Sequence, residues 1–203
     1  MTKRLSRLFA LVLGTALLMG VLAACGSGTT TTNSTPTATI TIKIATELPV
    51  SGSDAGSGKP AENGAHLAVD QANASNFLPG YKFEFDPQDD VGASGKHDQA
   101  VGAKNVTALI GDAEVAGIAG PFNSSVAQSE MPISNQAPIV QISPANTNTC
   151  LTQEGAAIGC SGSNDLVPTL RPTGRVTYFR IATTDSHQGC LLYTSPSPRD
   201  RQK

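Results

Sequence analysis

The sequence contains few charged residues and few aromatic ones. Its 203 residues include no Trp, only 4% aromatic residues and 15% charged residues, and the formal net charge is -2. Proteins that bind nucleic acid usually carry a surplus of Lys and Arg on one face, and no such surplus exists here. We therefore predict that nucleic acid is not a partner. Abundant Gly, Pro, Ser, Thr and Asn are typical of an exported protein with many ordered loops.

A nucleotide-binding motif is also missing. The stretch "SGSDAGSGKP" at residues 51–60 is rich in Gly and ends in Gly-Lys, as a phosphate-binding loop does. However, Ser53 stands where the first Gly of a Walker motif belongs. Pro60 stands where a Ser or Thr would hold Mg²⁺, and Pro has neither a hydroxyl nor an N–H. The pattern therefore excludes a nucleotide cofactor bound in this way.

No set of catalytic or metal-ligating residues is evident. The G-x-S-x-G elbow of hydrolases and the Cys/His spacings of zinc sites are both absent. His66 and His97 fall within predicted helices, and His187 has no obvious nucleophile near it. Asp89 and Asp90 could form an acid pair, but we interpret them as part of a solvated loop. We expect a protein that is not an enzyme and that uses neither a metal nor a cofactor.

The N-terminus is typical of an exported lipoprotein. Positive residues precede an apolar run at residues 8–22, as in a signal peptide. The run ends in "LAAC", which resembles a lipobox, and this resemblance implies cleavage after residue 24 and a diacylglycerol on Cys25. The alternative is an ordinary signal peptide with a chance Cys. Residues 25–39 have almost no large apolar side chain and predict a flexible tether, so we expect a membrane-anchored protein on the extracytoplasmic face, in the periplasm or at the cell surface.

The three remaining cysteines have different expected roles. Cys150 and Cys160 bracket nine residues in an exported chain, so we predict a local disulfide, with two free thiols as the alternative. Cys190 opens the segment "CLLYTSPSPRDRQK", residues 190–203, which resembles translated sequencing-adapter DNA. We expect the native sequence to end near Gly189. The alternative is a genuine disordered tail.

Hydrophobic periodicity predicts an α/β fold. Alternating or continuous apolar runs indicate strands at residues 39–49, 81–90, 115–122, 137–144 and 176–184. Helical spacing indicates helices at residues 60–76, 97–110 and 124–135. Strand and helix alternate, which predicts a flavodoxin-like parallel sheet with helices on both faces and right-handed crossovers. Residues 145–175 contain no secure helix and are expected to form a long loop.

In open α/β sheets, ligands bind beyond the carboxyl ends of the strands. Here those ends are the loops at residues 49–59, 120–125 and 143–148. Free N–H groups where a strand passes into a helix attract a carboxylate, and hydroxyls and amides add hydrogen bonds. We expect the ligand to contact Asn123, Ser124, Ser125, Ser143, Asn146 and Thr147. Helix capping and turn formation are the alternative explanation for any one of these residues.

Three stretches resemble the type I periplasmic-binding family of ABC importers, and most closely its branched-chain amino-acid (Leu/Ile/Val) binding proteins. They are "IKIATELPVSGSDAGSGKPAENGAHLAVDQAN", "VAGIAGPFNSSVAQSEMPISNQAPIVQISPANTN" and "TYFRIATTDSHQG". The resemblance implies two lobes that close on a ligand and dock on a membrane permease. Residues 40–184 are similar to the first lobe, and residues 185–189 to the start of the crossover. We expect the chain to be truncated before the second lobe.

The resemblance also implies roles for the site residues. Residues 123–125 and 143–147 correspond to the loops that hold the α-carboxylate and α-ammonium groups of an amino acid. Ser57 corresponds to a position at the mouth of the cleft, where the family often has an aromatic residue. We therefore expect a solute-binding lipoprotein that delivers an amino acid or a similar small polar solute to an ABC importer. The alternative is a receptor or regulator module with the same fold. Without a second lobe, binding should be weak or absent.

Overall fold

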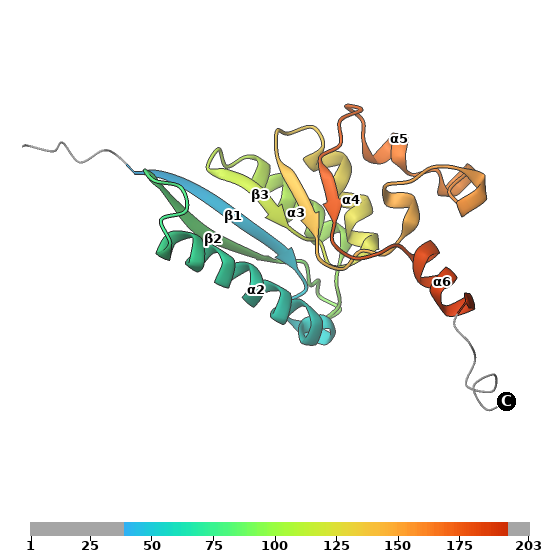
Figure 1. The fold of residues 1–203 in the computed structure, drawn as a ribbon, viewed down its shortest axis with the longest axis horizontal. Helices are drawn as coiled ribbons and strands as arrows, with labels where there is room; N and C mark the ends of the chain where they lie inside the picture. Colours follow the sequence, from blue (N-terminus) through green and yellow to red (C-terminus); the bar gives the residue numbers. More distant parts are fainter. Residues whose placement is uncertain (1–38, 195–203) are drawn as a thin grey trace, which may run out of the picture. The chain divides into compact units, whose positions relative to one another are not determined.

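The computed structural model describes residues 39–194, so the predicted signal peptide, Cys25 and all but the last residue of the predicted tether lie outside it. Five parallel strands form one sheet in the order β2-β1-β3-β4-β5 (Figure 1). The strands are β1 (Ile40–Leu48), β2 (Tyr81–Asp89), β3 (Val115–Ala119), β4 (Val140–Ser143) and β5 (Tyr178–Arg180). All five lie within the predicted ranges, and the predicted α/β fold with a parallel sheet is confirmed.

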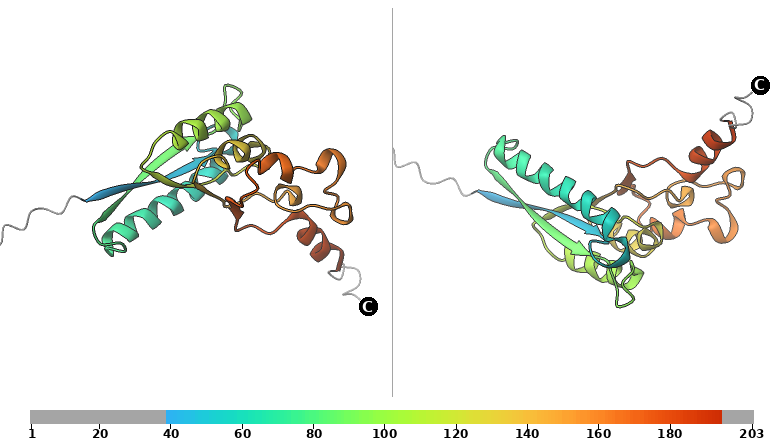
Figure 2. Two further views of the ribbon diagram at one scale, coloured as in Figure 1. Left: turned by 90° about the horizontal axis from the view of Figure 1, so that it is seen from above. Right: turned by 90° about the horizontal axis from the view of Figure 1, so that it is seen from below.

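Helices lie on both faces of the sheet, as the alternating pattern predicts. The three long crossover helices are α2 (Ala55–Ala74), α3 (Gln99–Ile110) and α4 (Ser124–Ser134). Helix α2 covers one face, whereas α3 and α4 pack together on the other (Figure 2, with α2 in teal and α3 and α4 in green to yellow). Among residues 39–194, no helix is both long and apolar enough to cross a membrane.

Helix α2 begins at Ala55, earlier than the start predicted at Pro60. A short 3-10 turn, η2 (Gly52–Asp54), leads directly into it. Close backbone packing fixes this start, because a Cβ atom on Gly58 would lie 2.1 Å from the carbonyl oxygen of Pro49. The sequence pattern gave too much weight to the preference of Pro for a first helical turn. The stretch expected to be a glycine loop is therefore mostly helix.

The long connection between β4 and β5 contains only short elements. Three 3-10 turns, η3 (Thr149–Leu151), η4 (Ala156–Ile158) and η5 (Gly162–Asn164), are followed by the one-turn helix α5 (Val167–Leu170). The predicted disulfide between Cys150 and Cys160 is confirmed, with a Cα–Cα distance of 5.2 Å. After β5, helix α6 (Asp185–Thr194) runs across the boundary predicted at Cys190. Whether the segment from Cys190 is native stays a prediction.

We expect the double substitution Cys150→Ser/Cys160→Ser to lower the free energy of unfolding by about 2–3 kcal/mol. The closed loop is short, so the entropy that the crosslink removes from the unfolded chain is modest. Urea unfolding of both proteins measures the difference. A reductant should destabilise the parent protein by a similar amount and leave the double variant unchanged. Equal stability of parent and variant would contradict the prediction.

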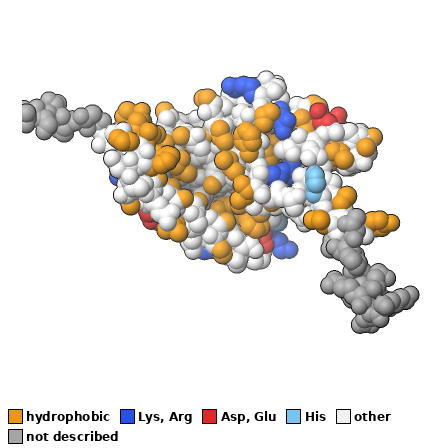
Figure 3. Space-filling view, in the orientation of Figure 1, with side chains coloured by type: hydrophobic (Ala, Val, Ile, Leu, Met, Phe, Trp, Pro, Cys, Tyr) orange, Lys and Arg blue, Asp and Glu red, His pale blue; other side chains and the backbone are white. Residues whose placement is uncertain are grey.

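One face of the sheet is only partly covered. Helix α2 packs on β1 and β2, while Val140 and Ile142 of β4 and Phe179 of β5 remain 42–46% exposed. Beside α2 there is an open cavity of about 310 Å³, and a second of about 190 Å³ lies over β3 and β4. Figure 3 looks onto this side and shows apolar side chains around a hollow. One side of α2 lines the larger cavity with residues at helical spacing, Ala65, Ala68, Val69 and Ala72.

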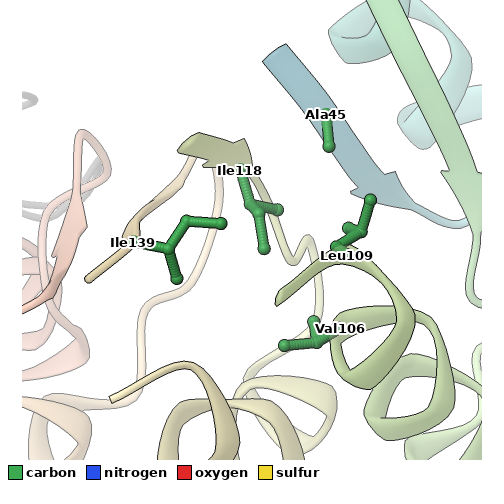
Figure 4. Close-up of a cluster of buried hydrophobic side chains, with 5 residues drawn as sticks. All are labelled: Ala45, Val106, Leu109, Ile118 and Ile139. Atoms are coloured by element: carbon green, nitrogen blue, oxygen red, sulfur yellow. The ribbon is translucent and has the colours of Figure 1, made fainter. Parts of the chain in front are cut away.

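The opposite face of the sheet carries the core. Ala45 of β1 and Ile118 of β3 point toward Val106 and Leu109 of α3, and Ile139 completes this cluster (Figure 4). A second cluster lies beneath the disulfide loop and consists of Ala127, Met131, Leu151, Leu170 and Tyr178. Side chains alternate between the two faces of a strand, so Ile118 of β3 and Gln141 and Ser143 of β4 are buried on this side of the sheet. This core fixes the positions of α4 and of the loops at the carboxyl ends of the strands.

Candidate ligand-binding site at the carboxyl ends of the strands

The N-terminus of α4 offers unpaired hydrogen-bond donors. Asn123 occupies the N-cap position, but its side chain makes no capping bond, and its buried Oδ1 has no hydrogen-bond partner among the described residues. The N–H groups of Val126 and Ala127 both donate to the carbonyl oxygen of Asn123. Within residues 39–194, the N–H groups of Ser124 and Ser125 have no acceptor. Such a helix end can bind an anion.

Ser143 and Asn146, two of the predicted site residues, use their side chains to hold two loops together. Both are buried, and both side chains bond to the loop that precedes α4. The Ser143 hydroxyl donates to the carbonyl oxygen of Pro121 at 2.6 Å. The Asn146 Nδ2 donates to the carbonyl oxygens of Pro121 and Phe122 at 3.1 and 2.7 Å. These contacts fit the alternative of turn formation, because the side chains hold one loop against the other.

Tyr178 completes this arrangement from β5. Its hydroxyl donates to Asn146 Oδ1 at 2.5 Å. Burial raises the pKa of Tyr178 to about 12, so the hydroxyl keeps its proton near neutral pH. The Asn146 amide is thereby occupied at both its oxygen and its nitrogen.

Thr147 remains available at this edge of the sheet. Its side chain is half-buried and makes no hydrogen bond within the described part of the chain, whereas its carbonyl oxygen accepts from the N–H of Asp185 at 2.8 Å. Ser124 Oγ accepts from the N–H of Asn148 at 3.4 Å, so the two loops also meet directly. The structure therefore brings residues 123–125 and 143–147 together, as the sequence predicts.

Ser57 lies on the first turn of α2 and is exposed. The carboxyl ends of the parallel strands share one edge of the sheet, so α2 starts on the same side of the molecule as α4 (Figure 1). Among residues 39–194, no hydrogen bond links Ser57 to the loops at residues 120–125 and 143–148. Its place at the mouth of a cleft stays a prediction.

Arg180 supports the loop at residues 143–148, and the sequence analysis did not predict this role. From β5, its Nη1 donates to the carbonyl oxygens of Asn148 at 2.7 Å and Asn146 at 3.3 Å, and its Nη2 donates to the hydroxyl of Thr152. Burial lowers the pKa of the Arg180 guanidinium. The sequence does contain a signal for this role, namely a lone Arg within the apolar stretch "TYFRIA". Such an Arg must satisfy its donors inside the protein, and here backbone carbonyls accept them.

The prediction that Asp89 and Asp90 belong to a solvated loop is wrong for Asp90. Its side chain is fully buried, and neither carboxyl oxygen has a hydrogen-bond partner in the part of the chain that the structure describes. Burial, followed by the charge of Glu47, raises the pKa of Asp90 to about 8. Asp89 accepts from the N–H groups of Val50 and Val91 and thereby shapes the end of β2. The periodicity of β2 could not show that the following loop is packed inward.

The histidines have structural partners. His66 stacks on Phe85 with a ring-centroid distance of 4.4 Å, and His97 Nδ1 lies 2.6 Å from Asp54 Oδ2. His187 Nδ1 lies 2.7 Å from Thr184 Oγ1. In the described part of the chain, no group of three or more His, Cys, Asp or Glu side chains is placed to hold a metal ion.

The family model for periplasmic binding proteins matches residues 41–170, which include four of the five strands and both contacting loops. The chain belongs to the periplasmic binding protein family. Its members are binding proteins of transport systems rather than enzymes, in agreement with the sequence analysis. No curated protein matches the sequence.

Solved structures with the same fold include binding proteins of ABC transporters. The substrate-binding protein LivJ from Streptococcus pneumoniae, in complex with isoleucine, is 27% identical with a TM-score of 0.53, over 71% of this chain and 34% of that one. A substrate-binding protein from Desulfitobacterium hafniense in complex with Leu is 22% identical, with a TM-score of 0.54, over 75% of this chain and 38% of that one.

A solute-binding protein from Rhodopseudomonas palustris in complex with 3,4-dihydroxybenzoic acid is 21% identical, with a TM-score of 0.51, over 71% of this chain and 32% of that one. This periplasmic binding protein chain thus spans about a third of the length of the solved structures it matches. The family match at residues 41–170 includes the candidate site on α4 and the loop that supports it.

Proposed function

We propose that this chain forms the first lobe of a solute-binding protein that takes an amino acid with a branched aliphatic side chain, or a similar small solute, for an ABC importer. The single observation that carries the proposal is the N-terminus of α4, where the N–H groups of Ser124 and Ser125 have no acceptor in the described residues. These donors and the positive end of the helix dipole suit the carboxylate of an amino acid.

Neighbouring groups would complete the recognition. Thr147 and the hydroxyls of Ser124 and Ser125 can each donate or accept a hydrogen bond, as an ammonium group beside a carboxylate requires. Ser143 and Asn146 serve as positioning residues, because their side chains hold the loop before α4. The family match and the isoleucine complex of the Streptococcus pneumoniae protein support an amino acid as the ligand class.

The N-terminal pattern supports a proposed location, and the family match supports a proposed partner. We propose that Cys25 carries a lipid and that residues 26–39 tether the folded part to the outer face of a membrane, where an ABC permease receives the solute. The charged start, the apolar run and the lipobox-like "LAAC" support this part of the proposal.

The carboxylate contact can be tested with Ser125→Asp. An acidic residue in the first turn favours the helix but repels an anion bound at its end, so we expect binding to weaken at least about tenfold without loss of stability. The measurement is a titration of the ¹⁵N-labelled chain with isoleucine, following the amide signals of Ser124 and its neighbours. Because only one side of the ligand would be contacted, the parent affinity should be weak.

Two controls make this titration specific. Isoleucine amide, which lacks the carboxylate, should leave the amide signals of α4 unchanged. Gln99→Asp places the same charge at the exposed first residue of α3, and this variant should bind isoleucine as the parent does. Equal responses to isoleucine and its amide, or unchanged binding by Ser125→Asp, would refute the proposed carboxylate site.

A further inference from the structure

Two fully buried glutamates join β1 to α4. Glu47 is near the end of β1, Glu130 is on α4, and their carboxyl groups are in hydrogen-bonding contact. One oxygen of each is held by an amide: Asn105 Nδ2 donates to Glu47 Oε1 at 3.0 Å, and Gln141 Nε2 donates to Glu130 Oε2. Among residues 39–194, nothing donates a hydrogen bond to the other two oxygens, Glu47 Oε2 and Glu130 Oε1. The pair therefore lacks donors for two buried oxygens.

The neighbouring amides cannot supply the missing donor. Asn105 Nδ2 also donates to the carbonyl oxygen of Asp89 at 2.9 Å, which holds this amide in place. The Gln141 amide is fixed in the same way, because its Oε1 accepts from the Ser134 hydroxyl at 2.9 Å. A proton on one of the two carboxyl groups is the remaining donor, since a protonated carboxyl is both donor and acceptor.

We propose that Glu130 holds a proton at neutral pH and donates it in a hydrogen bond to Glu47, so that one shared proton fastens helix α4 to strand β1. Two ionised carboxylates in contact inside the protein would repel each other and would both lack water. Sharing the proton removes the repulsion and supplies the missing donor. This inference concerns the folded lobe itself and does not depend on which ligand the protein binds.

The charged groups around the pair favour the protonated form. From the end of β2, the charge of Asp89 acts on Glu47; Asp90, whose pKa is about 8, is mostly protonated at neutral pH and repels Glu130 only as it ionises at higher pH. Helix α3 and strand β4 contribute the neutral amides described above, and Tyr178 faces Glu130 from β5. No Lys, Arg or His among residues 39–194 forms an ion pair with either glutamate. No nearby cation therefore offsets the negative charge.

Close packing seals the pair from water. A Cβ atom on Gly102 of α3 would lie 2.6 Å from Glu130 Oε1, so only glycine admits the carboxyl group at this place. Burial raises the pKa of Glu130 well above its ordinary value, and the charge of Glu47 raises it further. Burial also raises the pKa of Glu47, and the hydrogen bond from Glu130 partly opposes this shift. The proton therefore belongs mainly to Glu130.

The direction of the pH dependence follows from these shifts. A carboxyl group whose pKa is higher in the folded protein than in the unfolded chain keeps a proton that the unfolded chain has lost. Its contribution to stability is complete below the ordinary pKa of 4.5 and is lost as the pH rises through the folded value. Each such proton changes the unfolding equilibrium constant by up to about tenfold per pH unit within that window.

Urea unfolding across the range from about pH 5 to about pH 8 tests the proposal with three proteins: the parent, Glu130→Gln and Glu154→Gln. In Glu130→Gln, the new side-chain amide would donate a permanent N–H to Glu47. We therefore expect stability to fall less steeply with pH in this variant, because folding no longer retains this one proton. The difference from the parent should be about tenfold per pH unit in the unfolding equilibrium constant. Glu154 is exposed, so Glu154→Gln should follow the parent. Asp90 is present in all three proteins, and its titration also makes stability fall with pH. The effect of the glutamate pair is therefore the difference in slope between Glu130→Gln and the parent.

A spectroscopic measurement on the parent protein is independent of the variants. With ¹³C-labelled glutamate carboxyl groups, one signal should show a protonated carboxyl at neutral pH, and this signal should disappear in Glu130→Gln. The proposal is overturned if every glutamate carboxyl is ionised at neutral pH, or if Glu130→Gln keeps the slope of the parent. If Glu130→Gln does not fold, the parent's carboxyl spectrum and the slope of Glu47→Gln decide the question.

Discussion

Replacing Gly120 with Ala should destabilise the protein by about 3 kcal/mol or more, because this glycine joins β3 to the candidate site without room for a side chain. A Cβ atom at Gly120 would lie 2.2 Å from the carbonyl oxygen of Glu47. Its φ of 152° is also a conformation that residues with a side chain rarely adopt. The backbone of β1 cannot move away, since the neighbouring Glu47 side chain is fixed by its own contacts.

Gly117→Ala is the matched control for this prediction. Gly117 also belongs to β3, but a Cβ atom there would lie 3.5 Å from the nearest atom, the carbonyl oxygen of Val140, which is an ordinary contact. Urea unfolding should therefore show a small change for Gly117→Ala and a large loss for Gly120→Ala. Similar stabilities for the two variants would show that the chain at Gly120 can relax, contrary to its close packing on β1.

Ile118→Ala should lower the free energy of unfolding by about 2–5 kcal/mol. Ile118 is 2% exposed in the cluster between β3 and α3, and its truncation leaves a cavity among well-packed neighbours (Figure 4). Ile142 on the neighbouring strand β4 is 44% exposed, because it lies on the side of the sheet that α2 leaves open. The same truncation at Ile142 should cost less than about 1 kcal/mol.

The comparison of these two isoleucines tests how the faces of the sheet are covered. Both substitutions delete the same atoms from parallel strands, so the difference between them isolates the effect of burial. Thermal and urea unfolding of the two variants provide the measurement. A loss at Ile142 as large as that at Ile118 would mean that the exposed face of β4 is covered in solution, and the apparent molecular mass would then show whether a second copy covers it.

Some parts of the candidate site could be predicted from the sequence because they depend on local patterns. The start of α4 at Ser124 follows from the change from a continuous apolar run to helical spacing, and the structure places it at the predicted residue. The disulfide between Cys150 and Cys160 could be predicted from a short spacing in a chain with an export-like N-terminal sequence. The meeting of two loops follows from the rule that parallel strands end at a common edge.

Other parts depend on packing between distant segments. Ser143 and Asn146 have the same residue types as ligand-binding groups, but their hydroxyl and amide groups are occupied by the loop before α4. The early start of α2 depends on the approach of Gly58 to Pro49. Arg180 acquires its role only because β5 lies beside β4 and faces a loop formed some thirty residues earlier.

Local sequence patterns were enough to predict the order of strands and helices, the parallel sheet and the edge at which its strands end, because periodicity and connection length are properties of the chain. Tertiary packing was needed to show which polar side chains hold loops and which remain for a ligand. It also buries Glu47, Asp90 and Glu130 together, although they are far apart in the chain. Burial and mutual repulsion then set their protonation, and these effects arise only when separate segments exclude water from one place.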